Sequence, residues 1–403
     1  MTTPELTTQA TTAPVFGFLA PDHPFAGRMR GFRARLDERA APSGARCQVS
    51  SEVKGRRTPL GFALDRFYCS MQAWDTPGGQ PFESTTLYWS ARTGAEWVQF
   101  PAEPYLHQLP AYLAGLRSER GGSSYDVLRY VPLRRFTFRS AGLVGKFKRP
   151  SRLQDSAARA TAVVAAAAGS PVTVPAMRGV DTLHSIYFQD AVDGPALSDL
   201  VGPGNVTDLL GQAGRVHADF HALDAPGLPV AADPWAPLED VVHSTDWVAA
   251  LWPSLTGWLD ATRDQLLATA PTATAAAAGT CHGDLVLSHL LVTGDGCTVI
   301  DLDLAHIGDR YRDLALFLAG LPADAPALAG CPGTADSLAE AERAYLGAYE
   351  ERSGQRLDPR RLAWHRASAE LHQLAVLFAK DRIRLADVPR VRALVDSFVA
   401  AAR

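Results

Sequence analysis

Two acidic motifs in the C-terminal half constrain this 403-residue sequence more than any other feature. The first, CHGDLVLSHLLV, starts at Cys281 and carries His282 and Asp284 in a predicted loop. The second, VIDLDLAHIGDRYRDLALFLAGL, places Asp301 seventeen residues beyond Asp284, after an apolar strand, and Asp313 at the start of an apolar helix. Phosphoryl transfer needs one carboxylate to orient an attacking hydroxyl group and another to hold magnesium. The two motifs therefore predict a phosphotransferase site.

The order of these residues is similar to that of known families. A His-x-Asp loop followed by a metal-binding Asp after a hairpin is the arrangement of protein kinases. The motifs resemble the aminoglycoside phosphotransferase and choline-kinase-like superfamily, whose pattern is roughly H-G-D-x-x-x-x-N-x-L and then I-D-x-x-x-x-x-x-G-D-x-x-x-D-L-A. The second half matches at Ile300-Asp301, Gly308-Asp309 and Asp313-Leu314-Ala315. The resemblance covers roughly residues 126–318 and implies a protein-kinase-like bilobal fold of the α+β class.

The resemblance also implies roles for the acidic residues and the use of ATP and Mg²⁺. Asp284 would be the catalytic base, with His282 beside it in the catalytic motif. Asp301 would be the magnesium ligand, and Asp313 a structural anchor behind the loop.

One position departs from the family pattern. His289 stands where the family has an asparagine as the second metal ligand, five residues after Asp284. Magnesium prefers oxygen ligands to imidazole. The residue types alone leave four interpretations open. His289 binds the metal, His289 contacts a phosphate, Asp303 binds the metal in place of His289, or the site is degraded. A working enzyme is favoured, because Asp284, Asp301 and Lys146 are all present.

Two lysines precede the motifs on a predicted strand. In GLVGKFKRP, Lys146 and Lys148 alternate and so lie on one face. A solvated edge strand is the simpler interpretation. The resemblance instead implies that a strand lysine contacts the α- and β-phosphates of ATP, which fits Lys146 best and Lys148 as the alternative. Only Asp155 is available near the start of the following helix as an acidic partner.

No G-x-G-x-x-G sequence precedes these lysines. LRYVPLRRFTFR occupies its place and resembles the L-R-Y-x-P-x-R-R segment of an actinobacterial-type subgroup of these phosphotransferases. Its turn from Val131 to Leu133 would then cover the nucleotide, and Arg135 is a candidate phosphate contact. Further along, Gln189 to Val192 occupy the place of the family's inter-lobe hinge, which offers backbone groups to adenine.

A histidine pair, His217 and His221, lies at i, i+4 spacing on a predicted helix. Such a pair can bind zinc, but no third ligand lies nearby in the sequence. Core and helix-end packing is therefore the favoured interpretation.

The sequence divides into three regions. Residues 1–59 predict an N-terminal tail with a docking helix, whose apolar residues from Phe25 to Leu36 share one face. Residues 60–190 predict an N-lobe with a twisted antiparallel sheet, because β-branched and aromatic runs alternate with turn clusters. Residues 191–403 predict a helical C-lobe.

Composition excludes several classes of function. A formal charge of -4 gives no overall positive field for nucleic acid or an anionic membrane. No apolar run reaches the ~18 residues of a membrane helix, and the first twenty residues lack the charged start of a secretory signal. The five scattered cysteines form no C-x-x-C pair. These features predict a cytoplasmic protein with reduced cysteines.

Together these observations predict an ATP- and Mg²⁺-dependent kinase that phosphorylates a hydroxyl group of a small metabolite or of a peptide Ser or Thr. Arginine-rich C-terminal helices disfavour a polycationic aminoglycoside as acceptor. One alternative is a peptide kinase of a lanthipeptide-type pathway, acting with a leader peptide and a partner lyase. The other is a catalytically degraded binding module, which His289 keeps open.

Overall fold

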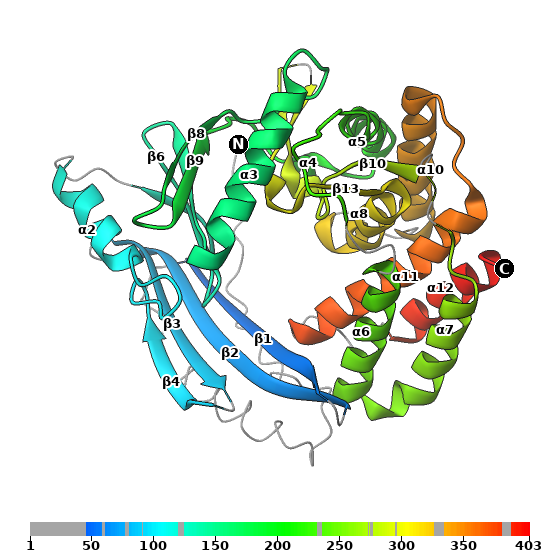
Figure 1. Cartoon of the computed structure of the whole chain (residues 1–403), viewed down its shortest axis with the longest axis horizontal. Coiled ribbons are helices and arrows are strands. Elements are labelled where there is room, and N and C mark those ends of the chain that lie inside the picture. Colours follow the sequence, from blue (N-terminus) through cyan, green and yellow to red (C-terminus); the bar gives the residue numbers. More distant parts are fainter. Residues whose placement is uncertain are drawn as a thin grey trace.

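The structure is a computed structural model of the whole chain (Figure 1). It describes residues 46–58, 61–76, 80–90, 92–119, 125–231, 236–272, 274, 277–294, 296–325, 334–380 and 388–403. The predicted docking helix and most of the predicted tail lie outside these residues.

A five-stranded antiparallel sheet forms the centre of the N-lobe, in the order β5-β6-β7-β9-β8. Its strands are β5 (Asp126–Val131), β6 (Arg135–Ser140), β7 (Leu143–Phe147), β8 (Met177–Asp181) and β9 (Ile186–Asp190). Helix α3 (Pro150–Ala167) follows β7, because Pro150 cannot continue the strand ladder and suits the first turn of a helix. This sheet contains the predicted lysine strand.

The register of this sheet separates an apolar face from a polar one. Phe136 lies opposite Phe147, and both pack with Tyr130 and Ile186 in an aromatic core that helix α2 (Leu109–Glu119) helps to cover. Successive side chains in a strand point to opposite faces. The neighbours of these aromatic residues, Lys146 among them, therefore point to the other face, toward the C-lobe.

A second, four-stranded antiparallel sheet precedes the first, in the order β1-β2-β3-β4. Its strands are β1 (Arg46–Thr58), β2 (Gly61–Thr76), β3 (Gln80–Ser90) and β4 (Gly94–Gln99). The prediction of one sheet starting at residue 60 was therefore wrong in two respects. The strands form two sheets, and β1 occupies residues assigned to the tail.

This four-stranded sheet packs against the C-lobe. The buried side chains of Val53, Phe67, Cys69 and Leu87 share a hydrophobic cluster with Val248 and other residues of the helices. In Figure 1 the sheet runs along the lower edge of the molecule, from the N-lobe to α6 (Ala236–Leu251). The opposite face of the sheet is mixed. Its hydroxyl groups bond one another, as in Thr86 with Ser70, and Tyr68, Tyr88 and Val98 pack on Leu133 in a hydrophobic cluster.

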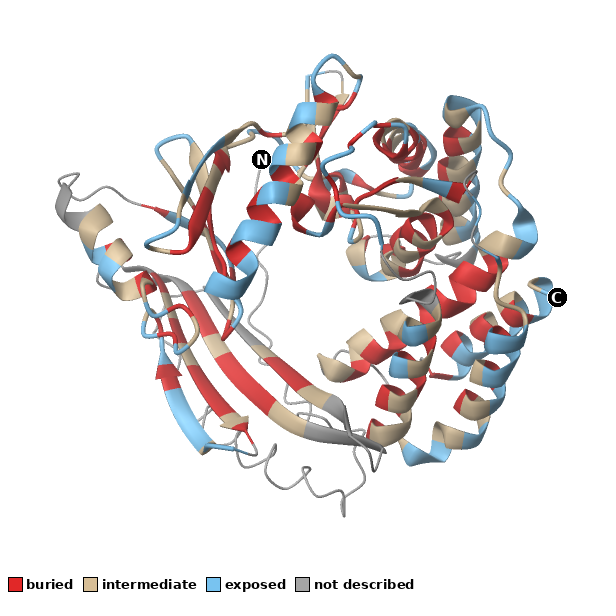
Figure 2. Ribbon diagram, in the orientation of Figure 1, coloured by how far each residue is buried: buried red, intermediate tan, exposed pale blue. Residues whose placement is uncertain are grey.

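The C-lobe is mainly helical, as predicted. Its longer helices are α5 (Val206–His221), α6, α7 (Thr256–Ala268), α8 (Arg310–Asp324), α10 (Thr334–Ser353), α11 (Pro359–Ala379) and α12 (Val388–Ala401). A four-residue helix, α4 (Leu197–Leu200), precedes them. Figure 2 shows α11 largely buried, whereas α7 and α12 expose their outer faces. Among the described residues, no helix is both long and apolar enough to cross a membrane.

Two short strand pairs carry the acidic motifs. Strand β10 (Ala278–Cys281) pairs with β13 (His306–Asp309), and β11 (Leu290–Thr293) pairs with β12 (Gly296–Val299). The loop after β10 holds Asp284, and the loop after β12 holds Asp301. The predicted bilobal plan, with a strand-rich N-lobe and a helical C-lobe, is confirmed.

Candidate active site

The loop that carries Asp284 is fixed by Asp313, in the first turn of α8. The backbone N–H groups of His282 and Gly283 donate to the two Asp313 carboxylate oxygens, at 2.7 and 2.8 Å. Gly283 has a φ of 82°, and a Cβ there would lie 2.7 Å from the Leu304 carbonyl oxygen. Only glycine fits this turn without displacing the neighbouring backbone.

Asp313 is held in turn by two histidines of α5. The Nε2 atoms of His217 and His221 lie 3.1 and 3.3 Å from one Asp313 oxygen, and their Nδ1 atoms bond the hydroxyls of Tyr345 and Tyr349. Burial lowers the pKa of His221 to about 3. Burial alone would raise the pKa of Asp313, but hydrogen bonds from both histidines hold it well below its usual value.

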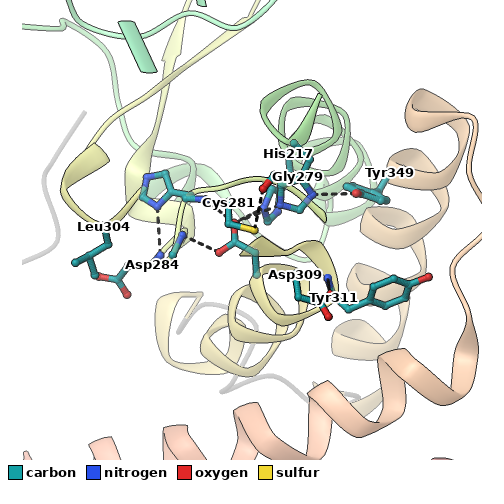
Figure 3. A network of polar contacts seen from close by, with 12 residues as sticks. His217, Gly279, Cys281, Asp284, Leu304, Asp309, Tyr311 and Tyr349 are labelled. Atoms are coloured by element: carbon teal, nitrogen blue, oxygen red, sulfur yellow. Dashed lines mark hydrogen bonds and ion pairs between the residues drawn. The ribbon is translucent and has the colours of Figure 1, made fainter. Parts of the chain in front are cut away.

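This arrangement bears on whether His217 and His221 bind zinc or pack in the core. The three residues lie close enough together to hold a metal ion. However, all four ring nitrogens are already in hydrogen bonds, so neither imidazole offers a free lone pair. Figure 3 shows the network behind the catalytic loop, with Asp284 on one side and Tyr349 on the other. The packing interpretation is favoured over a zinc site, and Asp313 occupies the anchoring position that the motif implied.

His282 is buried behind the loop and is not exposed to solvent. Its side chain is fully buried, its Nε2 atom donates to the Ile300 carbonyl oxygen at 2.9 Å, and its Nδ1 atom accepts from the Asp284 N–H at 3.4 Å. The ring therefore connects the Asp284 loop to the residue immediately before Asp301. This geometry fits a positioning residue rather than one that exchanges protons with a substrate.

Asp284 has an exposed side chain, although the protein around it removes part of the water from its carboxyl group. Burial, together with repulsion from the nearby Asp301 carboxylate, raises the pKa of Asp284 above its usual value. A carboxylate with a raised pKa is a better proton acceptor than an ordinary surface aspartate.

Asp301 is the meeting point of three basic side chains. Its oxygens lie 2.8 Å from Lys146 Nζ, 3.5 Å from Arg135 and 3.4 Å from His289 Nε2. Its φ is 64°, in the left-handed region that non-glycine residues seldom adopt and that is found at functional sites. Burial opposes ionisation of Asp301, but the positive charges of Lys146 and Arg135 hold its pKa well below the usual value.

The orientation of His289 determines which nitrogen can bind a ligand. Its Nδ1 atom lies 2.9 Å from the Asp284 carbonyl oxygen, which can only accept, so Nδ1 carries the hydrogen. Burial lowers the pKa of His289 to about 4, which keeps the ring neutral. The Nε2 lone pair therefore faces the carboxylate of Asp301. Two acceptors that face each other make a suitable place for a cation.

Lys148, the alternative phosphate-binding lysine, hydrogen-bonds a different carboxylate from Lys146. Lys148 Nζ bonds one oxygen of Asp303, and the Tyr187 hydroxyl bonds the other. Burial lowers the pKa of Lys148, whereas the carboxylates Asp301 and Asp303 outweigh burial and raise that of Lys146. Both Asp303 oxygens are thus engaged, which disfavours its predicted role as a metal ligand. Asp155, the predicted lysine partner on α3, is exposed.

The turn from Val131 to Leu133, which was predicted to cover the nucleotide, is held by hydrogen bonds at both the N–H and the carbonyl group of Leu133. Leu133 has a φ of 64°, its N–H donates to Glu103 at 3.0 Å, and its carbonyl accepts from Arg149 at 2.5 Å. Glu103 also accepts from the Tyr130 hydroxyl and is buried. Sequence reasoning missed Glu103, because it lies in an irregular segment where no periodicity distinguishes a buried acid from a solvated one.

The predicted hinge follows β9. Gln189 is 2% exposed, and its Nε2 atom has no hydrogen-bond partner among the described residues. Val192, three residues on, is half-buried. The Asp190 and Ala191 N–H groups bond Ala176 and Gly142, so this connection between the lobes is well fixed.

Two lobes with a strand lysine, a loop aspartate and an aspartate after a hairpin are the arrangement of a kinase-like phosphotransferase. The family model described as the phosphotransferase enzyme family, APH, matches residues 134–365. The chain belongs to this family, which confirms the predicted enzyme class. No curated protein sequence matches the chain significantly.

Solved structures confirm the kinase-like fold. A thermostable mutant of the aminoglycoside phosphotransferase APH(4)-Ia is 17% identical, with a TM-score of 0.51, and the match covers 71% of this chain and 97% of that one. A provisionally assigned aminoglycoside phosphotransferase from Ralstonia eutropha JMP134 is 20% identical, with a TM-score of 0.50 over 73% and 97%. An amicoumacin kinase, in complex with AMP-PNP, Ca²⁺ and Ami, is 11% identical, with a TM-score of 0.50 over 72% and 93%.

Proposed function

We propose that the protein transfers the γ-phosphoryl group of ATP to a hydroxyl group of a small molecule, with Asp284 as the base. The observation that carries this proposal is the position of Asp284, with a raised pKa, beside an ionised Asp301 that Lys146 contacts. In this reaction the acceptor oxygen bonds the γ-phosphorus and the bond to the bridging oxygen of ADP breaks. The proton of the acceptor hydroxyl passes to Asp284.

The remaining residues would either contact the nucleotide or hold the loops in place. Lys146 would contact the phosphates, with Arg135 as a second cation on the same carboxylate. Asp303 would hold Lys148 in place, and His282 would position Asp284 through its contact with the loop backbone. Backbone groups from Gln189 to Val192 would contact adenine.

The donor set at Asp301 fits a divalent cation. The Asp301 carboxylate supplies oxygen, and the His289 Nε2 lone pair, 3.4 Å away, supplies nitrogen. A cation held by these residues would neutralise phosphate charge. Because imidazole suits transition metals better than magnesium, we expect Mn²⁺ to bind here at least as well as Mg²⁺.

Small hydroxylated molecules are the favoured acceptor class, because a kinase of similar fold is named for the small molecule amicoumacin. No contact among the described residues favours a peptide acceptor, a leader peptide or a partner lyase. The binding-module alternative is the negative outcome of the experiment that follows.

The test measures thermal stability with ATP, with and without Mg²⁺ or Mn²⁺, for the wild type, Asp301→Asn and Asp284→Asn. Ligand binding to the native state raises the melting temperature. We expect a metal-dependent rise in the wild type and in Asp284→Asn, and none in Asp301→Asn. Over a panel of hydroxylated molecules, Asp284→Asn should release ADP about 10²- to 10⁴-fold more slowly than the wild type.

A different pattern would overturn the proposal. A rise that ignores both metal and Asp301 would indicate a nucleotide-binding module without transfer. Full ADP release by Asp284→Asn would remove Asp284 from the reaction.

A further inference from the structure

Arg129 on β5 lies on the same face of the five-stranded sheet as Lys146, and no role has been assigned to it. The register pairs Arg129 with Thr137, and Thr137 with Lys146. Directly opposed residues in antiparallel strands point to the same face. Leu128, just before it, is the extra residue of a β-bulge. Bulges near active sites re-aim side chains, so Arg129 is presented toward the same space as Lys146.

The other cations of this face already have carboxylate partners. Lys146 and Arg135 contact Asp301, and Lys148 contacts Asp303. Arg129 is exposed, and in the part of the chain that the structure describes no hydrogen bond or ion pair engages its guanidinium group. Among the described residues of this face, Arg129 therefore adds a positive charge that no carboxylate holds in a direct ion pair.

The turn between β5 and β6 leaves phosphates without backbone donors. Pro132 has no N–H group. The Leu133 N–H donates to Glu103, and the Arg134 N–H donates to the Val131 carbonyl at 3.1 Å. A phosphate beneath this turn must therefore take its hydrogen bonds from side chains, unlike one in a glycine-rich cradle.

The positive charge of Arg129 acts electrostatically on both Asp284 and Asp301. It also opposes the rise in the pKa of Asp284 that burial causes. The guanidinium group thus lies near both the base and the metal-side carboxylate, which the transferred phosphoryl group must approach.

We propose that Arg129 binds the terminal phosphoryl group of the nucleotide and neutralises its charge during transfer. The inference rests on the proposed function and adds a residue to it. A guanidinium group suits this task because its paired N–H donors match phosphate oxygens. Arg129 forms and breaks no covalent bond; the proton still passes to Asp284.

The test compares two nucleotides that differ only in the terminal group. Binding of Mg²⁺-AMP-PNP and Mg²⁺-ADP is measured by calorimetry for the wild type, Arg129→Gln, Arg129→Lys and the control Arg152→Gln. Arg152 is an exposed arginine on α3, away from the paired strand positions. We expect Arg129→Gln to weaken AMP-PNP binding about 10- to 100-fold, the range for hydrogen bonds to charged groups, and ADP binding less than about twofold.

Arg129→Lys should recover part of the affinity for AMP-PNP, and Arg152→Gln should match the wild type for both nucleotides. Equal losses for both nucleotides, or no loss, would overturn this inference alone. A wild-type protein that binds neither nucleotide would overturn the proposed function as well, so the two failures are distinguishable.

Discussion

At the scale of single residues, Asp313 accepts hydrogen bonds from several buried groups at once. Its carboxylate receives two backbone N–H groups of the Asp284 loop and two histidine Nε2 atoms, all within 3.3 Å. Every one of these groups is buried or partly buried. Removing one partner of such a buried cluster leaves the others without hydrogen bonds.

We therefore expect Asp313→Ala to lower the free energy of unfolding by about 3–5 kcal/mol, measured by urea denaturation. Phosphoryl transfer should fall with it, because the Asp284 loop loses its anchor. Asp260→Ala, at a half-exposed ion pair with Arg263, is the control and should cost less than about 1 kcal/mol. A similar loss in both variants would contradict the anchoring role.

The site residues differ in how far they could be predicted. Asp284, Asp301 and Asp313 could be singled out from two short motifs and the family resemblance that these motifs carry. The partners of Lys148 and Leu133 could not be predicted, since Asp303 and Glu103 reach them only through tertiary contact. Arg129 was not singled out for the same reason, because its direction depends on a bulge.

At the scale of elements, helix α11 carries a buried acid with unusual titration. Burial raises the pKa of Glu370 to about 7, although Arg366 opposes this rise. Arg366 in turn pairs with Glu342 of α10 at 2.6 Å. Between pH 4.5 and 7 the folded state therefore binds more protons at Glu370 than the unfolded state, and stability falls as the pH rises through this window.

Glu370→Gln mimics the protonated side chain. We expect it to raise the free energy of unfolding at pH 8 by up to about 3 kcal/mol and to change it little near pH 4.5. Urea unfolding at both pH values measures the difference. The exposed variant Glu351→Gln should show no such pH dependence. Equal effects of Glu370→Gln at both pH values would refute the assignment.

The elements also show where pattern reasoning ends. Runs of β-branched and aromatic residues between turn clusters predicted strands from residue 60 onward, and residues 191–403 predicted a helical lobe. The same runs are satisfied by one sheet or by two, because a strand pattern says nothing about strand partners. The partner of the face that includes Val53 and Phe67 is supplied by α6 and α11, far along the chain.

At the scale of the whole molecule, the four-stranded sheet packs against both lobes, and we expect it to make them one cooperative unit. Phe67 is 1% exposed, stacks on Trp89 at 5.4 Å and shares a cluster with residues of α6 and α11. We expect Phe67→Ala to lower the free energy of unfolding by about 3–5 kcal/mol in a single transition. Trp97→Ala, at a 39% exposed ring of β4, should cost much less. Two separate transitions in calorimetry would show that the sheet unfolds by itself.

Because of this sheet, the limits of the family match differ from the limits of the folded unit. The family match begins at residue 134 and ends at residue 365. Strands β1 to β3 and helix α12 lie outside it, yet their buried side chains complete the cluster around Trp364. We therefore expect residues 134–365 on their own to keep Asp284, Asp301 and Asp313 in the chain but to expose the apolar surface that the outer strands and α12 cover.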